Sequence, residues 1–142
     1  MKMKGGKIDC LTRLAGMVKI DFEVPQCGIW CLHIQKALFR VLESNNLIIT
    51  NWDMGKPSKN FKGNRFYWDK PGNNLYDDQI VEHKEKILGA TIDEIIINGK
   101  DLMLRLDKNL RIDVISYTLE LDNEVYRVFE KESKNNHFIV ET

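Results

Sequence analysis

The side chains best suited to chemistry gather in one stretch, Trp30 to Asp53. Apolar and polar residues alternate there, the period-2 pattern of strands that pack one face on a core. A two-residue turn at 36–37 would place His33 opposite Arg40, with Gln35 on the same face. An imidazole beside an amide and a guanidinium could bind an anion or transfer a proton, so this face is the first candidate site.

Three potential metal ligands, Cys27, Cys31 and His33, follow one another along the same stretch. Structural zinc sites draw a second pair of ligands from elsewhere, and the chain has no second cysteine cluster. On one strand the two cysteines would lie about 13 Å apart, too far for a disulfide. We interpret them as small hydrophobes in a reducing cytoplasm, and we expect neither a metal nor a cofactor.

A second candidate site is the segment Lys56 to Lys70, where cations alternate with aromatic rings. Cations bind phosphates and rings stack on bases, which is what single-stranded nucleic acid binding requires. Rings that anchor a loop on the core give the same pattern, and a formal net charge of zero makes nucleic acid the less favoured interpretation. The residues concerned are Lys56, Lys59, Lys62, Arg65 and Trp68.

The established motifs of nucleophilic, nucleotide-binding and zinc-protease sites do not occur in the sequence. If the protein is an enzyme, His33 is the best candidate for a general base, oriented by Asp53 or Asp69, with Arg40 as an anion clamp. We favour a polar cluster without catalysis.

The elements that position these residues are mostly strands. A helix is expected over 75–88, with Asn74 as its N-cap and Gly89 at its C-terminal end. The sequence therefore predicts an α+β fold of nine or ten mostly antiparallel strands with one central helix. The strands are expected at 16–24, 28–35, 38–43, 47–52, 91–98, 101–106, 110–116, 118–122, 125–130 and 137–141, with a short one at 66–69.

The 142 residues are expected to form a single domain with a flexible tail over 1–9. A shift of 72 positions superposes apolar residues of the two strand runs, such as Trp30 on Leu102. One possible architecture is therefore two similar β-meanders that the helix joins, 14–72 and 88–142. Any two alternating hairpins can be aligned in this way, so chance similarity is the alternative.

Charge is unevenly distributed, because residues 1–72 carry a formal charge of +6 and residues 73–142 carry −6. We expect the halves to attract each other within one fold or across a homodimer; the alternative is that the first half faces a polyanion. The basic start has no apolar segment after it, and no apolar run is long enough to span a bilayer. A cytoplasmic protein with no membrane partner is expected.

Several short strings occur together in a recognisable order. The chain resembles an uncharacterised family of small bacterial proteins, which implies no activity. The matching residues are Leu32 to Gln35 with Arg40, Asp53, Phe66 to Asp77, Asp101 to Ile112, Tyr126 to Phe129, and His137 to Val140. Ala37-Leu38-Phe39 departs from a Cys-Pro-Trp-like turn, and Tyr126 replaces a Trp. The second half also resembles, more loosely, immunity proteins of bacterial toxin systems.

The resemblance adds further polar residues to the candidate site around His33 and Gln35. We hypothesise that some of them converge at one end of the sheet as a ligand-binding site. Ion pairs and helix caps would explain the same residues without a ligand. The residues that it marks are His33, Arg40, Asp53, Asp69, Asn74, Asp77, Arg127 and His137.

These observations favour a binding or interaction protein, such as an immunity-type inhibitor, whose partner is another protein. Its acidic second half would attract a basic enzyme. A small-molecule enzyme that uses His33 and Arg40, and a binder of single-stranded nucleic acid through Lys56 to Lys70, are the alternatives.

Overall fold

Within the described residues, ten strands form two five-stranded sheets, accompanied by one α-helix and one 3₁₀-helix. The structure is a computed structural model that describes residues 3–121, 123–131 and 137–141. The bounds are β1 Lys7–Leu14, β2 Met17–Val24, β3 Gly28–Ile34, β4 Ala37–Glu43, β5 Asn46–Thr50, η1 Asn51–Gly55, α1 Leu75–Ile87, β6 Ile92–Asn98, β7 Asp101–Leu106, β8 Leu110–Ser116, β9 Glu124–Glu130 and β10 His137–Glu141.

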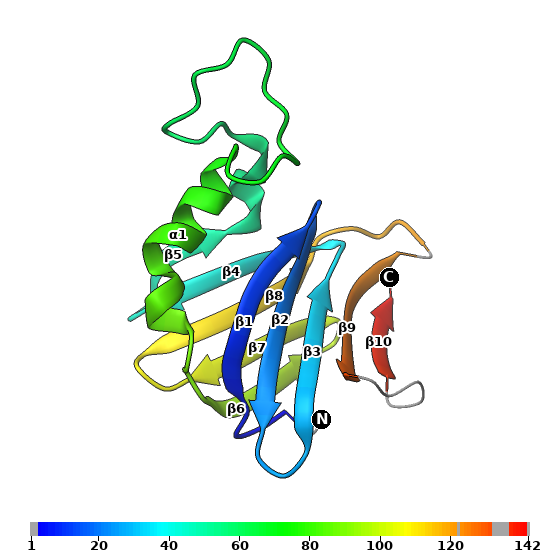
Figure 1. The fold of residues 1–142 in the computed structure, drawn as a ribbon. Helices are drawn as coiled ribbons and strands as arrows, with labels where there is room; N and C mark the ends of the chain where they lie inside the picture. The colour runs from blue at the N-terminus through cyan, green and yellow to red at the C-terminus, as the bar shows by residue number, and fades with distance from the viewer. Residues whose placement is uncertain (1–2, 122, 132–136, 142) are drawn as a thin grey trace.

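The two sheets pack face to face around one core. The first sheet has the order β1-β2-β3-β9-β10 and the second the order β5-β4-β8-β7-β6, with antiparallel neighbours throughout. In Figure 1 the strands of the first sheet cross in front of those of the second at a large angle. Alternate side chains, such as Ile20 and Leu32 from one sheet and Phe39 and Leu104 from the other, are fully buried between them. The predicted α+β class with antiparallel strands is confirmed.

The predicted hairpin between β3 and β4 is wrong, because these strands belong to different sheets. Gln35 and Lys36 join them, and their backbone N–H groups donate to the carbonyls of Val125 and Glu124 at 3.0 and 3.1 Å. The chain therefore passes from the first sheet to the second, as strands do at the corners of crossed sheets. Neither residue of this link favours positive φ, whereas Asn109 between β7 and β8 has φ 60° and joins a true hairpin.

The strand pairing does not show the internal repeat that the sequence offered as one possibility. Its alignment equates β3 and β4 with β7 and β8, yet only β7 and β8 pair with each other. The strand expected at 118–122 is absent over its described residues 118–121, and so is the one expected at 66–69. The strand expected at 47–52 ends at Thr50, whose side chain accepts a hydrogen bond from the Trp52 N–H and caps η1. Chance superposition of alternating patterns explains the similarity.

The segment predicted as a flexible tail is ordered within its described part. Met3 is fully buried, and Ile8 lies in β1 with 1 % of its surface exposed. The backbone N–H groups of Gly5 and Ile8 donate to the carbonyls of Ile92 and Ala90 at 2.9 and 2.8 Å, which ties β1 to the start of β6. Lysines and glycines around these few apolar positions hid the strand pattern in the sequence.

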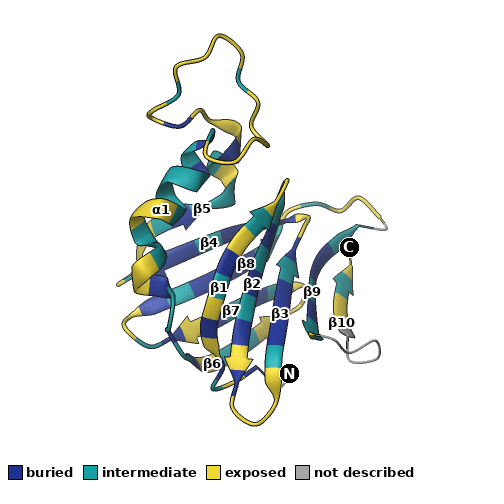
Figure 2. Cartoon of the chain, viewed as in Figure 1, coloured by how far each residue is buried: buried dark blue, intermediate teal, exposed yellow. Residues whose placement is uncertain are grey.

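Helix α1 begins and ends close to the predicted residues. The Asn74 side chain accepts a hydrogen bond from the Asp77 N–H, and Gly89 after the helix has φ 86°. The helix packs beside β5, with Tyr76 buried against Phe39 at a ring distance of 6.4 Å. Residues 56–73, which we call the basic loop, project beyond the sandwich between η1 and α1 (Figure 1) and are mostly exposed (Figure 2).

Candidate functional site

His33 and Arg40 do not share a site. His33 pairs with Lys19 and Arg127 in the first sheet, whereas Arg40 pairs with Thr50 and Asp113 in the second. Their neighbours along each strand point into the core, so the two side chains lie on opposite outer faces of the sandwich. The predicted pocket with His33 as base and Arg40 as clamp is therefore wrong. A sequence cannot distinguish a hairpin from a strand that changes sheet when both bury alternate residues.

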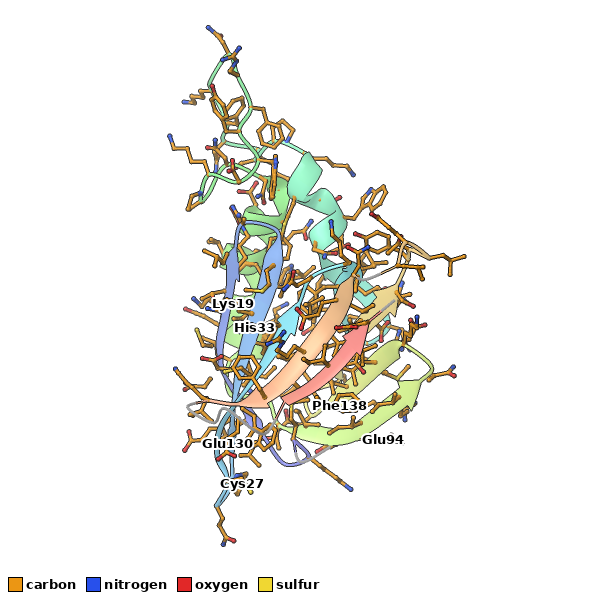
Figure 3. All side chains as sticks on the ribbon, turned by 90° about the vertical axis from the view of Figure 1, so that its right-hand side faces the viewer. Lys19, Cys27, His33, Glu94, Glu130 and Phe138 are labelled. Carbon is orange, nitrogen blue, oxygen red and sulfur yellow. The ribbon has the colours of Figure 1, made fainter. Side chains whose placement is uncertain are left out.

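Three predicted residues do come together on the outer face of the first sheet: His33, Gln35 and Arg127. Gln35 Nε2 and Arg127 Nε donate to the two oxygens of Glu124, at 2.9 and 2.6 Å. Figure 3 shows Lys19 next to His33, and the ring of Phe129 meets the imidazole edge-on at 4.7 Å.

The pKa of His33 is lowered, first by burial and then by the positive charge of Lys19; Asp21 and Glu124 oppose the shift. The imidazole lies beside a satisfied ion pair, and its neighbours on this face include the Lys19 amine and the buried Cys31 thiol, whose raised pKa disfavours a thiolate.

Arg40 belongs to a separate structural cluster on the second sheet. Its Nε lies 2.9 Å from Oδ2 of Asp113, and Arg111 Nε lies 3.0 Å from Oδ1 of the same carboxylate. Asp113 is 4 % exposed, so the two guanidinium groups compensate a buried charge. Arg40 therefore forms an ion pair, but with Asp113 and not with the acidic residues that the sequence suggested.

The predicted acidic residues Asp53, Asp69 and Asp77 gather with Asn74 where α1 begins, and they hold the basic loop in place. Asp77 binds Arg13, which the sequence did not single out, and it also accepts a hydrogen bond from the Gly72 N–H at 2.9 Å. Asp53 accepts from Gln79 Nε2 at 2.7 Å and pairs with Lys56 at 3.0 Å.

Asp69 enters this network through its backbone carbonyl, which accepts from Arg13 Nη1 at 3.3 Å. These contacts are the caps and ion pairs that would explain the residues without a ligand. His137 begins β10, and its side chain lies outside the described part of the structure.

The two cysteines lie in different environments, and of the two only Cys31 fits the interpretation as a buried hydrophobe. Cys27 is exposed in the β2–β3 turn and Cys31 is buried in β3. Burial, followed by a hydrogen bond to Asp21, raises the pKa of the Cys31 thiol to about 12, which disfavours the thiolate that a metal requires. In the part of the chain that the structure describes, no three His, Cys, Asp or Glu side chains are grouped to hold a metal ion.

The structure also contains a cavity that the sequence did not reveal. A groove of about 810 Å³ opens at one end of the sandwich, between the β1–β2 turn, the β3–β4 link, η1 and the segment after β8; we call it the end groove. Three large residues on its rim are mainly exposed: Leu14 by 65 %, Trp52 by 75 % and Tyr117 by 64 %. Apolar residues at the ends of strands were the available signal.

The end groove is built from fixed parts. Asn51 Oδ1 accepts from the Phe39 N–H at 2.8 Å, and Asn51 Nδ2 donates to the Ala37 carbonyl at 3.0 Å. These bonds hold η1 against the start of β4. Met54, which also lines the groove, is 7 % exposed. The groove therefore exists before any partner binds.

The basic loop adjoins the end groove. A Cβ atom on Gly16, which lines the groove, would lie 3.5 Å from Cη2 of Trp68, so the indole rests on the β1–β2 turn. The loop has its own cavity of about 410 Å³, lined in part by Lys62, Arg65 and Lys70. Of the residues predicted to bind nucleic acid, Lys62 and Arg65 line this cavity, Lys56 pairs with Asp53, and Lys59 is exposed.

No α-helix among the described residues is long and apolar enough to cross a membrane. Comparison of the chain with protein-family models, curated proteins and solved structures finds no match. Function must therefore be argued from the end groove and the basic loop.

Proposed function

We propose that this protein is a binding module that recognises another protein through the end groove. The observation that carries the proposal is the exposure of Leu14, Trp52 and Tyr117 around one concave surface. Large apolar side chains that cluster on an exposed surface mark an interaction site, because burying them against a partner removes apolar area from water.

The composition of the rim supports a protein partner. Tryptophan and tyrosine are enriched among residues that dominate binding energy, and each can bury roughly 150–250 Å². Trp52 and Tyr117 on the rim thus anchor a partner segment that inserts an apolar side chain into the groove.

An enzymatic role has less support. The polar groups beside the groove are few, and the amide of Asn51 is already bonded to the backbone on both sides. His33 and Arg40 lie on other faces. A binding surface requires no catalytic group, and the groove supplies a concave shape and exposed apolar and aromatic area.

The immunity-type role remains a prediction. Its acidic surface was expected on the second half, where exposed carboxylates come from four elements: Glu82 and Glu85 on α1, Asp93 and Glu94 on β6, Glu120 after β8, and Glu141 on β10. The described lining of the end groove holds one charged residue, Lys36, and the basic loop adjoins the groove; both argue for an acidic partner surface there.

Selection from a random peptide library, each peptide about 12 residues long, tests the proposal directly. The immobilised wild-type protein should enrich a peptide family, and fluorescence anisotropy of one labelled member should give a Kd at least about tenfold higher for the double variant Trp52→Ala, Tyr117→Ala. Both side chains are mainly exposed, so the variant should keep its circular dichroism spectrum.

The matched control removes exposed apolar residues elsewhere. Leu47→Ala on β5 and Val81→Ala on α1 change side chains that are 54 % and 82 % exposed and do not line the groove. They should leave the Kd unchanged within about twofold. The proposal fails if no peptide family is enriched, or if the selected peptides bind the groove variant as tightly as the wild type.

A further inference from the structure

The basic loop concentrates positive charge, most of which has no carboxylate partner among the described residues. Among the described residues, Lys59, Lys62, Arg65 and Lys70 form no ion pair, and Asp69 is the only carboxylate between residues 56 and 73. Arg65 is the one arginine in the described ranges that lacks a carboxylate partner. Its Nη1 lies 3.3 Å from the Tyr67 hydroxyl.

The loop is shaped by specific contacts. The Ser58 N–H donates to the Asn73 carbonyl at 2.7 Å, and Ser58 Oγ and the Lys59 N–H donate to the carboxylate of Asp78 at 2.7 and 2.9 Å. The rings of Phe61 and Phe66 stack edge to face at 5.8 Å. These contacts hold open the cavity that Lys62, Arg65 and Lys70 line together with the Tyr67 phenol, and no carboxylate lines it.

Arg13 joins this cavity to the end groove. Its Nη1 donates to the carbonyl of Ala15 at 3.0 Å, and its Nη2 donates to the carbonyl of Lys70 at 3.3 Å. Ala15 lines the end groove and Lys70 lines the loop cavity. The apolar and the cationic surfaces are therefore neighbours on one end of the molecule.

We propose that the partner segment is an acidic peptide, with an apolar side chain in the end groove and a carboxylate in the cavity of the basic loop. This inference rests on the proposed function, because it names the chemistry of the partner that the groove holds. A guanidinium fork and two ammonium groups around a concave surface suit a carboxylate, and Arg65 has donors free of any carboxylate.

The arrangement favours a peptide over a nucleic acid. A nucleic acid strand gains affinity from many phosphates along an extended basic track, and the sequence as a whole has zero formal charge. Here the cations that lack carboxylate partners are confined to one loop beside an apolar groove. One or two carboxylates next to an apolar anchor match both surfaces at once.

The composition of the selected peptides gives the first test. Peptides enriched on the wild type should contain Glu or Asp close to a large apolar residue. One synthetic member should lose at least about tenfold in affinity when its acidic residues become Gln, and raising NaCl from about 50 to 500 mM should weaken it similarly.

A charge reversal then locates the effect. Lys62→Glu with Arg65→Glu should abolish the difference between the acidic peptide and its Gln version, while the affinity for the Gln version stays within about twofold. The matched control, Lys100→Glu with Lys108→Glu, makes the same charge change at two exposed turns of the second sheet and should preserve the difference. All four side chains are exposed, so folding should be unaffected.

The outcomes separate the two proposals. Equal binding of the acidic and Gln peptides, with loss in the Trp52 and Tyr117 variant, refutes the acidic partner and leaves the groove function intact. If the double variant Trp52→Ala, Tyr117→Ala binds the peptides as tightly as the wild type, both proposals are refuted. Oligo(dT) of about 15 nucleotides serves as the polyanion probe: if it binds more tightly than the peptide and loses binding on the Lys62 and Arg65 reversal, the loop is a nucleic-acid site and the inference is wrong.

Discussion

Arg13 donates hydrogen bonds to both carboxylate oxygens of Asp77, from Nε to Oδ1 and from Nη2 to Oδ2, each at 2.7 Å. The pair joins the end of β1 to the first turn of α1, and the hydrogen bond to Asp77 raises the pKa of Arg13. The two side chains are 9 % and 16 % exposed. This contact connects the first sheet to the helix and to the base of the basic loop.

Replacing Arg13 should therefore destabilise the protein. Arg13→Ala removes the cation that pairs with the mostly buried Asp77 carboxylate, and we expect a loss of about 2–3 kcal/mol in the free energy of unfolding, measured by urea denaturation. Arg105→Ala breaks the Arg105–Glu94 pair, whose side chains are 61 % and 51 % exposed. It should change the free energy of unfolding by less than about 1 kcal/mol. Equal effects from both variants would contradict this account.

Met3 should behave as a core residue. Its side chain is fully buried, and Met3→Ala should reduce the free energy of unfolding by about 2–4 kcal/mol because it leaves a cavity. Lys4→Ala, at the exposed neighbouring position, should stay within about 0.5 kcal/mol of the wild type. Thermal denaturation followed by circular dichroism distinguishes the two, and an unchanged Met3 variant would restore the flexible-tail prediction.

The cysteines should differ sharply in reactivity. Iodoacetamide at pH 8 should modify the exposed Cys27 readily and Cys31 hardly at all, because Cys31 is buried and its pKa of about 12 keeps it protonated. Peptide mass spectrometry at several times measures each site, and urea should make Cys31 reactive. Rapid labelling of Cys31 in the native protein would show that β3 is not covered as described.

His33 should make the protein less stable in mild acid. Its folded-state pKa is below the ordinary value of about 6.5, so the unfolded state binds the proton first as the pH falls through that value. The stability contributed by neutral His33 is present above that range and is lost on acidification.

Urea titrations of the wild type and His33→Gln at pH 5 and pH 7.5 measure this contribution. The variant should lose less stability than the wild type between the two values. A larger loss of stability in the variant would contradict the lowered pKa of His33 that burial and Lys19 cause.

The sequence revealed local structure better than long-range arrangement. Alternation marked most strands, and the Asn74 cap and Gly89 marked the ends of the helix, because these signals arise from neighbouring residues. Whether β3 turns back on itself or passes to the other sheet depends on its pairing with β9, which lies far along the chain. The mistaken hairpin at that link placed His33 beside Arg40, whereas the structure separates them.

The candidate site was hidden for the same reason. Leu14, Trp52 and Tyr117 come from segments far apart in the sequence, and each alone is an ordinary apolar residue at the end of an element. Only the crossing of the two sheets gathers them. The basic loop was visible because its charges and rings are contiguous, although the sequence did not show that it borders an apolar groove.

The interleaved strand order also governs how the chain can fold during synthesis. The first three strands can form a meander early, but β3 receives its second neighbour only when β9 emerges from the ribosome, and β4 must similarly wait for β8. Until then both strands offer open hydrogen-bonding edges to other nascent chains. The two sheets can therefore close together only after β8 and β9 have emerged, which makes closure a slow, non-local step.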